Sequence, residues 1–406
     1  MSARPVPGRL ADDREILYFF DDEARASSFT PPADPRPLPP RPEPGELRFD
    51  ELSGEWTAIA AHRQTRTYLP PADQCPLCPS GHAGADGTRR ESEIPAADYD
   101  VVVFENRFPS LGPIAGAIPA HPHWGEPVPA TGRCEVVAFT SEHTGSFATL
   151  PLRRARTVLD AWAERTAALS ALPGIAQVFV FENRGAQIGV TLHHPHGQIY
   201  AYPYVTPRGA LLGERAAAHL ESTGTLLGER LLLAEQREGS RVITMGEHFT
   251  SYVPWAARWP LEVHISAHRH VGRLDELTDA EREDAARVYL DTLNRLDHLY
   301  DSPTPYIAAW NQAPADPRLR AASWLHLQVT SPRRAADKLK FLAGSEAAMG
   351  AFINDTVPEQ VAERLRSVSG EPTAPAPAPA SAAVSVPTSA AASAARASAP
   401  DPVVDR

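Results

Sequence analysis

Apolar residues follow two patterns along the chain, one typical of strands and one typical of helices. Together the two patterns predict an α+β protein. Short apolar runs bounded by turn residues are typical of strands, whereas residues 152–172 carry apolar side chains at helical spacing. The strands of the first half are expected at 46–50, 52–60, 98–109 (a strand that runs into a loop), 136–143 and 177–181. The helix stands between the last two of them, and the first two form a hairpin around a Ser-Gly turn.

The second half repeats this order of elements. Its matching strands are expected at 248–254, 264–268, 306–311 and 324–329. Thr278 and Glu281 form a capping box that opens a helix ending near residue 300, again between the second and third strands. We therefore expect a duplicated chain, in which two similar halves form one mainly antiparallel sheet with packed helices.

The two ends of the chain differ in composition from the part between them. Residues 1–45 are rich in proline and are expected to form a mostly extended arm on the surface. Residues 371–406 are mainly alanine, proline, serine and valine, and such a segment buries too little apolar surface to stay ordered. The folded body then divides into an N-terminal half, 46–205, and a C-terminal half, 206–370.

Charge and composition exclude several classes of protein. The net charge of -11 argues against a nucleic-acid-binding protein with a broad basic face. No apolar run is long enough to span a membrane, and the N-terminus lacks an apolar signal-like stretch. The expectation is a cytoplasmic enzyme that binds neither nucleic acid nor membranes.

Cys75 and Cys78 form a Cys-x-x-Cys pair, which serves either as half of a zinc site or as a redox pair. A thioredoxin-like redox pair needs a strand before it and a helix after it, but prolines stand on both sides of this pair. A zinc knuckle on a loop is favoured, and a tetrahedral ion then needs two more ligands. The third cysteine, Cys134, begins an apolar strand and is expected in the core.

Three imidazoles and a carboxamide crowd into the segment 193–198, His-His-Pro-His-Gly-Gln. In an extended chain His194, His196 and Gln198 share one face, so one histidine can hold a metal while the next acts on a substrate. His196 is the candidate nucleophile, because a neutral imidazole attacks phosphorus without a strong base. Gln198 would donate to a phosphoryl oxygen as charge develops.

Further details of this segment bear on its chemistry. A backbone carbonyl near residues 194–195 is expected to fix the tautomer of the nucleophile, and Gly197 would let a phosphate approach the backbone. A cupin-like metal site is excluded because residues 197–202 hold no carboxylate. His121 and His123 lie in a proline- and glycine-rich loop without a following strand, and we do not expect them to form a site.

The segment 194–198 resembles the His-Pro-His-Gly-Gln signature of galactose-1-phosphate uridylyltransferases, large relatives of the histidine-triad nucleotide-binding proteins. The resemblance covers residues 46–368 and implies two histidine-triad-like halves. It places the remaining zinc ligands at His143, after a Ser-x-His strand end, and at His194. Together with Cys75 and Cys78, these would hold one structural zinc ion per chain.

The resemblance also implies the residues that bind the nucleotide sugar. A His-Arg-x-x-Arg run supplies two arginines for the diphosphate, and a segment near residue 340 contacts the hexose. The implied substrate-binding residues are Arg63, Arg66, Asn106, Arg107, Asn183, Gly189, Thr191, Gln198, Lys340, Phe341 and Glu346. Arg107 departs from the family, in which an aspartate is common at that position.

A second metal bound by some members of that family is not expected in this chain. Its ligands would be a glutamate and three histidines, but the matching positions hold Asn311 and Gln328, and only His326 is kept. Leu212 falls near the glutamate position, with Glu214 as an approximate substitute.

The function implied by the resemblance is uridylyl transfer from UDP-glucose to galactose 1-phosphate by a ping-pong path through a uridylyl-histidine at His196. A homodimer with sites completed across the interface is also implied. Two alternatives remain open: a nucleotide-sugar or dinucleoside polyphosphate phosphorylase on the same scaffold, and a zinc-stabilised nucleotide-binding module without turnover.

Overall fold

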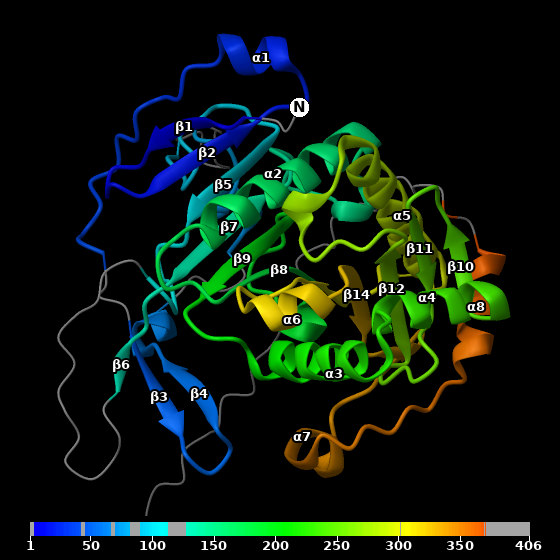
Figure 1. Ribbon diagram of the computed structural model, residues 1–406. Helices are drawn as coiled ribbons and strands as arrows, with labels where there is room; N and C mark the ends of the chain where they lie inside the picture. Colours follow the sequence, from blue (N-terminus) through cyan, green and yellow to red (C-terminus); the bar gives the residue numbers. More distant parts are fainter. Residues whose placement is uncertain are drawn as a thin grey trace, which may run out of the picture. The chain divides into compact units, whose positions relative to one another are not determined.

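An eleven-stranded sheet forms the centre of the protein (Figure 1). It is seen in a computed structural model that describes residues 4–41, 45–65, 70–81, 90–112, 127–300, 302–368 and 370. Its strands, in spatial order, are β1 (Val6–Arg9), β2 (Glu15–Phe19), β5 (Val101–Glu105), β7 (Arg133–Ala138), β9 (His196–Tyr202), β8 (Gln177–Arg184), β13 (Tyr306–Asn311), β14 (His326–Ser331), β12 (Leu261–Ala267), β11 (Phe249–Tyr252) and β10 (Val242–Met245). Each neighbouring pair runs antiparallel, so the predicted α+β class with one antiparallel sheet is confirmed.

The order of the strands confirms the duplication. The order β5-β7-β9-β8 in the first half matches β11-β12-β14-β13 in the second, and the halves meet where β8 pairs with β13. The buried carboxylate of Glu182 on β8 accepts hydrogen bonds of 2.8 Å each from Tyr306 of β13 and Tyr289 of α5 (Asp279–His298). Burial raises the pKa of Glu182 to about 7. This contact ties the two halves together beneath the central strands.

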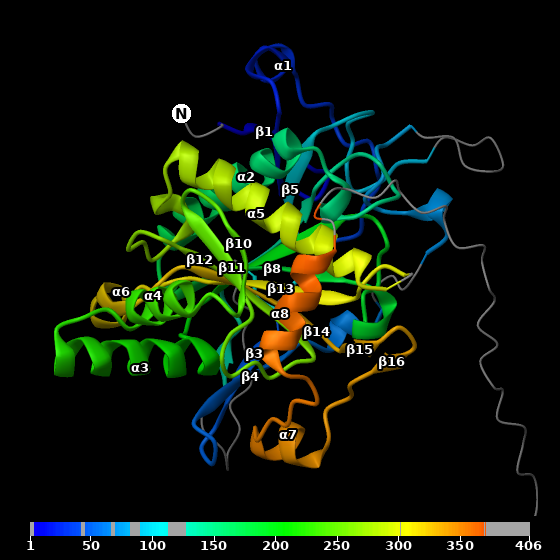
Figure 2. The same ribbon diagram turned by 90° about the vertical axis from the view of Figure 1, so that its right-hand side faces the viewer.

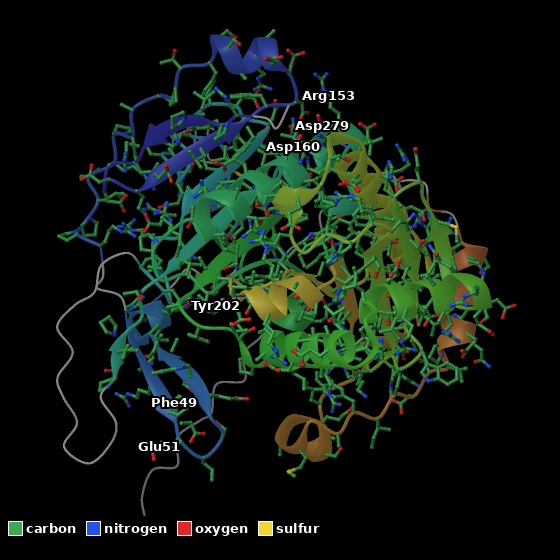
Figure 3. All side chains as sticks on the ribbon, viewed as in Figure 1. Phe49, Glu51, Arg153, Asp160, Tyr202 and Asp279 are labelled. Carbon is green, nitrogen blue, oxygen red and sulfur yellow. The ribbon has the colours of Figure 1, made fainter. Side chains whose placement is uncertain are left out.

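One long helix from each half covers the same face of the sheet: α2 (Leu152–Ser170) and α5 (Figures 1 and 2). The predicted capping box forms, because the N–H of Glu281 donates to Oγ1 of Thr278 and the N–H of Thr278 donates to Oε2 of Glu281. Arg282 of α5 pairs with Asp279 at 2.5 Å and with Asp160 of α2 at 2.7 Å, at the junction where Figure 3 labels both aspartates.

The opposite face of the C-terminal half is covered by shorter and more exposed helices: α3 (Pro207–Thr223), α4 (Leu227–Glu238) and α6 (Pro317–Ala322) (Figures 1 and 2). Gln236 of α4 donates to Oγ1 of Thr250 on β11 at 2.9 Å, which anchors that helix to the sheet. In the N-terminal half the same face of the sheet carries the histidine segment. The sequence analysis did not anticipate α3 or α4.

The N-terminal segment differs from the extended arm expected from its prolines. Residues 4–41 include β1 and β2, which form a hairpin at the edge of the main sheet, and a short helix, α1 (Glu23–Ser28). Ile16 and Phe19 of β2 are buried against the body. Apolar side chains in β2 therefore outweigh the proline content, which is concentrated in the stretch after α1.

A small three-stranded sheet stands beside the main one. The predicted hairpin forms as β3 (Glu46–Asp50) and β4 (Glu55–Ile59), and β6 (Val128–Pro129) pairs with β3. Gly54 occupies the left-handed region in its turn, at φ 72°. The remaining elements are the 3-10 helices η1 (Ala61–Thr65), η2 (Ala72–Gln74), η3 (Phe147–Thr149), η4 (Ala186–Ile188) and η5 (Leu274–Glu276), the strands β15 (Arg333–Ala335) and β16 (Lys338–Leu339), and the helices α7 (Gly344–Met349) and α8 (Pro358–Ser367).

Several expectations fall on residues outside the described part. These are the tail 371–406, the loop with His121 and His123, and Arg66. Every described element belongs to residues 1–375. None of the described helices is both long enough and apolar enough to cross a membrane.

Candidate active site and metal centre

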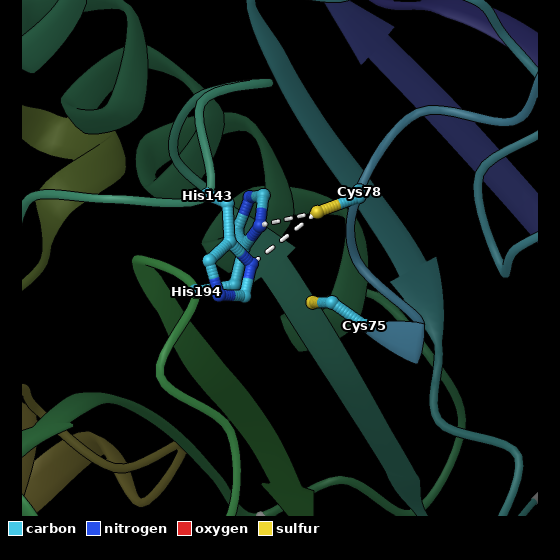
Figure 4. A group of neighbouring side chains, drawn as sticks. All are labelled: Cys75, Cys78, His143 and His194. Atoms are coloured by element: carbon cyan, nitrogen blue, oxygen red, sulfur yellow. Dashed lines mark hydrogen bonds between the residues drawn. The ribbon is translucent and has the colours of Figure 1, made fainter. Parts of the chain in front are cut away.

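Cys75, Cys78, His143 and His194 lie together in the N-terminal half (Figure 4). One ligand atom from each lies within 4.8 Å of the other three. Sγ of Cys78 is 3.3 Å from Nδ1 of His143 and 3.6 Å from Nδ1 of His194. A tetrahedral zinc ion holds a sulfur and a nitrogen ligand about 3.5 Å apart. The four residues therefore fit such an ion, and they are the one metal-type cluster found among the described residues.

The surroundings of His194 prepare its Nδ1 as a ligand. Its Nε2–H donates to the carbonyl oxygen of Thr140 at 2.7 Å, which leaves the lone pair on Nδ1. The hydroxyl of Tyr99 lies 3.0 Å from the same Nε2 and donates at 2.7 Å to the carbonyl oxygen of Leu77, between the two cysteines. The buried tyrosine thus connects a histidine ligand to the loop that carries the thiols.

The electrostatics of the cluster favour a thiolate. The hydrogen bond with Cys78, followed by the imidazoles of His143 and His194, lowers the pKa of the Cys75 thiol. The hydrogen bond to Cys75 in turn raises the pKa of His143. A thiolate beside imidazole nitrogens is a donor set that suits zinc.

Two sequence-based placements need correction. The strand predicted to reach His143 ends at Ala138, so this ligand lies in the turn that follows β7. His194 lies in a bend, and β9 begins only at His196, so the two do not share a strand face. Pro195 explains the break, because it has no N–H for the ladder; its carbonyl instead accepts from the N–H of Phe139 at 3.1 Å.

His196 is fixed in the tautomer that a nucleophile requires. Its Nδ1–H donates to the carbonyl oxygen of His194 at 2.7 Å, the backbone contact expected from the sequence, and Nε2 keeps its lone pair. Burial lowers the pKa of His196, so the ring is neutral near pH 7. Burial alternates along β9, and it places His196 and Gln198 on the side of the sheet away from α2 and α5.

Gly197 has a different role from the one expected. It lies on the opposite side of β9 from His196, facing the core. A Cβ at this position would lie 2.8 Å from the ring of Phe139 and 3.0 Å from the carbonyl oxygen of Phe181. The glycine therefore makes room for an aromatic ring beneath the strand rather than for a phosphate above it.

Arg63 reaches the histidine strand through a tyrosine that the sequence analysis missed. Its Nη1 donates to the hydroxyl of Tyr200 at 3.4 Å, and that hydroxyl donates to Oε1 of Gln198 at 3.3 Å. Tyr200 lies two residues beyond Gln198 on the same face of β9, so strand periodicity could have identified it. The contact brings positive charge to the carboxamide expected to bind a phosphoryl oxygen.

The C-terminal half carries a reduced copy of this arrangement on β14. Nδ1–H of His326 donates to the carbonyl oxygen of Trp324 at 3.0 Å, as in β9, and burial lowers the pKa of this imidazole to about 4. Gln328 follows at the same spacing but donates at 2.7 Å to Glu262, whose carboxylate also contacts His264 at 3.2 Å. The glutamine of the copy is thus engaged by neighbouring side chains.

Comparison with known proteins agrees with this geometry. The models of the N-terminal and C-terminal domains of galactose-1-phosphate uridyl transferase match residues 43–206 and 214–374. A galactose-1-phosphate uridylyltransferase of Streptomyces lividans is 44% identical over 379 residues, covering 89% of this chain and 97% of the relative. One from Thermotoga maritima is 35% identical over 333 residues, covering 80% and 99%. A solved uridylyltransferase structure matches with a TM-score of 0.68 and 32% identity, covering 79% and 97%.

The chain belongs to the galactose-1-phosphate uridylyltransferase family. The resemblance carried by the histidine segment is thereby confirmed for the whole folded body. In this member of the uridylyltransferase family, the remaining residues expected to bind substrate lie in loops beside β9 and in the C-terminal segment.

The loop expected to hold the nucleotide, residues 106–108, follows β5 directly. The Oδ1 of Asn106 accepts from the N–H of Phe108 at 2.9 Å, and the N–H of Asn106 donates to the carbonyl oxygen of Cys134 at 2.8 Å. His62, next to Arg63, lies 2.9 Å from the carbonyl oxygen of Pro109. These contacts place the arginine segment beside the nucleotide loop, and Cys134 is buried in β7 as expected.

Three other expected residues lie along the path from β8 to the histidine segment. Asn183 is paired with Ile307 in the ladder and is partly exposed on the same side of the sheet as His196. Gly189 ends η4 in the left-handed region at φ 81°, a conformation that favours glycine. Thr191 follows, partly exposed, just before the histidines.

In the C-terminal segment, two of the three residues expected to bind substrate, Lys340 and Glu346, bind each other. Nζ of Lys340 pairs with Glu346 at 2.5 Å and also donates to the carbonyl oxygen of Ile353. The hydrogen bond from Lys340 lowers the pKa of Glu346 to about 2. Phe341 is 78% exposed. Both charged groups are therefore engaged with each other, and only the aromatic ring is free to meet a ligand.

A hollow of about 160 Å³ lies between this segment and the loop that contains Gln187 and Ile188. Its walls include Ile307 and Thr330 from the central strands, together with residues 339–342. Within one chain, the segment expected to contact the hexose thus lies next to the loop expected to contact the phosphates.

Proposed function

We propose that the protein exchanges a uridylyl group between UDP-glucose and galactose 1-phosphate through a covalent bond to His196. The observation that carries the proposal is the hydrogen bond from Nδ1–H of His196 to the carbonyl oxygen of His194, which leaves Nε2 as a neutral nucleophile. Membership of the family supports the choice of substrates.

The reaction balances in two displacements. Nε2 attacks the α-phosphorus of UDP-glucose, an N–P bond forms, and the P–O bond to glucose 1-phosphate breaks as that group leaves with the electron pair. An oxygen of galactose 1-phosphate then attacks the same phosphorus, and the electron pair of the N–P bond returns to Nε2 as UDP-galactose leaves. No separate general base is needed, because neutral Nε2 and the galactose 1-phosphate dianion both attack without losing a proton. No general acid is needed either, because glucose 1-phosphate leaves as a dianion and the imidazole leaves neutral.

Other residues are assigned by their position relative to His196. Gln198 shares its strand face and would donate to a phosphoryl oxygen, supported by Arg63 through Tyr200. Asn106 and Arg107 would hold the nucleoside, and Phe341 would meet the hexose. The residues proposed to bind the phosphates are Arg66, Asn183, Gly189 and Thr191.

We further infer that the four-residue cluster holds one structural zinc ion per chain. A site with two cysteines and two histidines is closed, so it leaves no open position for a reacting water. Cysteines persist as thiols in a reducing compartment, which supports a cytoplasmic location.

The test is incubation with UDP-glucose labelled in its uridylyl phosphate. An acid-labile label trapped on His196 is expected, with release of glucose 1-phosphate. Galactose 1-phosphate should then remove the label faster than inorganic phosphate does. An unlabelled protein would mean a binding module, and preference for inorganic phosphate would mean a phosphorylase.

A homodimer is proposed from apolar side chains that no described residue covers. Leu52 at the tip of the β3–β4 hairpin is 97% exposed, and Phe341, Met349 and Ile353 are exposed along the C-terminal segment. Exposed apolar groups gathered on two projecting segments are typical of an interface. A two-fold dimer would bury both segments and could bring Phe341 and its neighbours to the partner's site.

Complementation decides whether the C-terminal segment acts across that interface. Lys340→Ala removes the ion pair with Glu346 that holds the segment presenting Phe341, and this subunit should be inactive alone, as should His196→Ala. Mixed dimers of the two should regain up to about half of the wild-type activity, because one site of each mixed dimer is whole. The nearby, exposed Lys338→Ala subunit is the matched control and should be active alone. Failure of verified mixed dimers to recover activity would show that Lys340 serves its own chain.

A further inference from the structure

Glu93 lies where three parts of the N-terminal half meet. Its carboxylate accepts a hydrogen bond of 2.6 Å from Nη2 of Arg14 and one of 2.7 Å from Nη1 of Arg36. Its backbone N–H donates to the carbonyl oxygen of Pro76 at 3.0 Å, within the loop of the metal-type cluster. Its Oε1 also lies 3.8 Å from Nη1 of Arg107 in the nucleotide loop. Glu93 thus connects the N-terminal segment, the cysteine loop and the nucleotide loop.

Both arginines come from the N-terminal segment, which precedes residue 43, where the match to the family model begins. Arg14 is fully buried and also donates at 2.9 Å to the carbonyl oxygen of Glu105, the last residue of β5. Arg41 pairs with the carboxylate of the same Glu105. The segment therefore holds both the carboxylate that faces Arg107 and the strand end from which the nucleotide loop departs.

The distances show which arginines Glu93 binds closely. Its two oxygens are taken at 2.6 and 2.7 Å by Arg14 and Arg36, whereas the contact to Arg107 is longer at 3.8 Å. Arg107 donates no hydrogen bond to the described residues and remains partly exposed. A carboxylate without these close partners would bind a neighbouring guanidinium through two short hydrogen bonds. The two N-terminal arginines therefore hold the carboxylate of Glu93 at closer range than Arg107 does.

We propose that Arg14 and Arg36 are positioning residues that compete with Arg107 for the carboxylate of Glu93 and so keep the donors of Arg107 available to the acceptor oxygens of the bound nucleotide. The N-terminal segment, which precedes the part matched by the family model, then sets the affinity for the nucleotide. The inference rests on the proposed uridylyl transfer and adds the segment that controls it.

Arg36 is the residue to change, because Arg14 has no exposed surface and its loss would disturb the core. Arg36→Gln frees Oε1 of Glu93, while Glu93 keeps Arg14 as a partner and Arg14 keeps Asp12 at 2.8 Å. Arg107 should then be drawn into a close pair with Glu93. The expected result is a rise of about tenfold in KM for UDP-glucose, because one charge-assisted hydrogen bond to the ligand is lost. The value of kcat should be unchanged.

The double variant Arg36→Gln/Glu93→Gln separates positioning from support of the fold. A neutral glutamine cannot capture Arg107, so KM should return to within about twofold of the wild-type value. Recovery is expected even though Arg36 loses its ion pairs with Asp34 and Glu93, and Glu93 loses those with Arg14 and Arg107. If Arg36 and Glu93 only stabilised the loop, the double variant would be as impaired as the single variant or more so. A double variant without recovery, or an Arg36→Gln variant with unchanged KM, overturns the inference.

Arg25→Gln is the matched control, because Arg25 lies in the same segment and pairs with Asp98 and Asp100, away from Glu93. It should leave KM unchanged, and melting temperatures of all variants would show that they fold. Labelling of His196 in the wild-type protein is measured in the same assay. If the wild type takes no label, the proposed function fails and the inference falls with it; if it does and the KM pattern is absent, only the inference fails.

Discussion

His196→Ala is expected to reduce the turnover of UDP-glucose by roughly 10⁶-fold, the scale on which loss of a covalent nucleophile acts. Nε2 of this ring is the atom proposed to bind the uridylyl group, and its lone pair is available because Nδ1–H is held by the carbonyl oxygen of His194. Gln198 and Arg63 remain in the variant, so UDP-glucose should still bind. The measurements are kcat for exchange and the amount of uridylyl label retained by the protein.

His193→Ala is the matched control, because it removes an imidazole from the same segment. This ring is exposed, whereas His194 is buried. The control should keep activity and label within about twofold of the wild type. Retention of label by His196→Ala, or loss of activity in both variants alike, would show that another residue carries the covalent bond.

The strands and long helices could be predicted because their burial follows a simple period. The histidine segment was treated as extended and corresponds to β9, helical spacing predicted α2, and a capping box predicted the start of α5. The duplication followed from the order of these elements, and the pairing of β8 with β13 is its physical result. β1 and β2 were missed because prolines elsewhere in their segment dominated its composition. Helices α3 and α4 are largely exposed, and they carry only a few buried positions each.

Some site residues could be predicted from the sequence, whereas the roles of others depend on contacts with distant residues. The two cysteines were predicted from their Cys-x-x-Cys spacing, and they lie in the metal-type cluster. His196 was predicted from residue type, spacing and the family resemblance. The orientation of Gly197 was misjudged because it depends on Phe139, a residue far away in the sequence that packs beneath the strand. Likewise, the pairing of Lys340 with Glu346 requires knowledge of how the C-terminal segment folds back on itself. Contacts between distant residues decide both cases, and one sequence does not specify them locally.

Cys75→Ser is expected to abolish zinc binding and to lower the free energy of unfolding by on the order of 5 kcal/mol or more, since zinc binding to sites of this type supplies roughly 10–16 kcal/mol in small peptides. The ion would connect the cysteine loop to the turn after β7 and the bend before β9, which already bind each other through the hydrogen bonds of His194 to Thr140 and of Phe139 to Pro195. Metal content and thermal unfolding measure the effect, and a fall of about 5–10 °C in Tm corresponds to it. Cys134→Ser is the control, because it changes a buried cysteine that lies outside the cluster.

Activity should be lost under conditions in which the demetallated protein is still folded. His194 is both a ligand, through its ring, and the acceptor for Nδ1–H of His196, through its carbonyl oxygen. Release of the ring frees the bend at Pro195, the carbonyl oxygen leaves its position, and the imidazole of His196 no longer holds one tautomer. At low temperature, kcat for exchange should therefore fall with zinc content while the far-UV circular dichroism remains unchanged. A zinc-free protein with full activity would show that the bend keeps its shape without the ion, and that the metal and the nucleophile are independent.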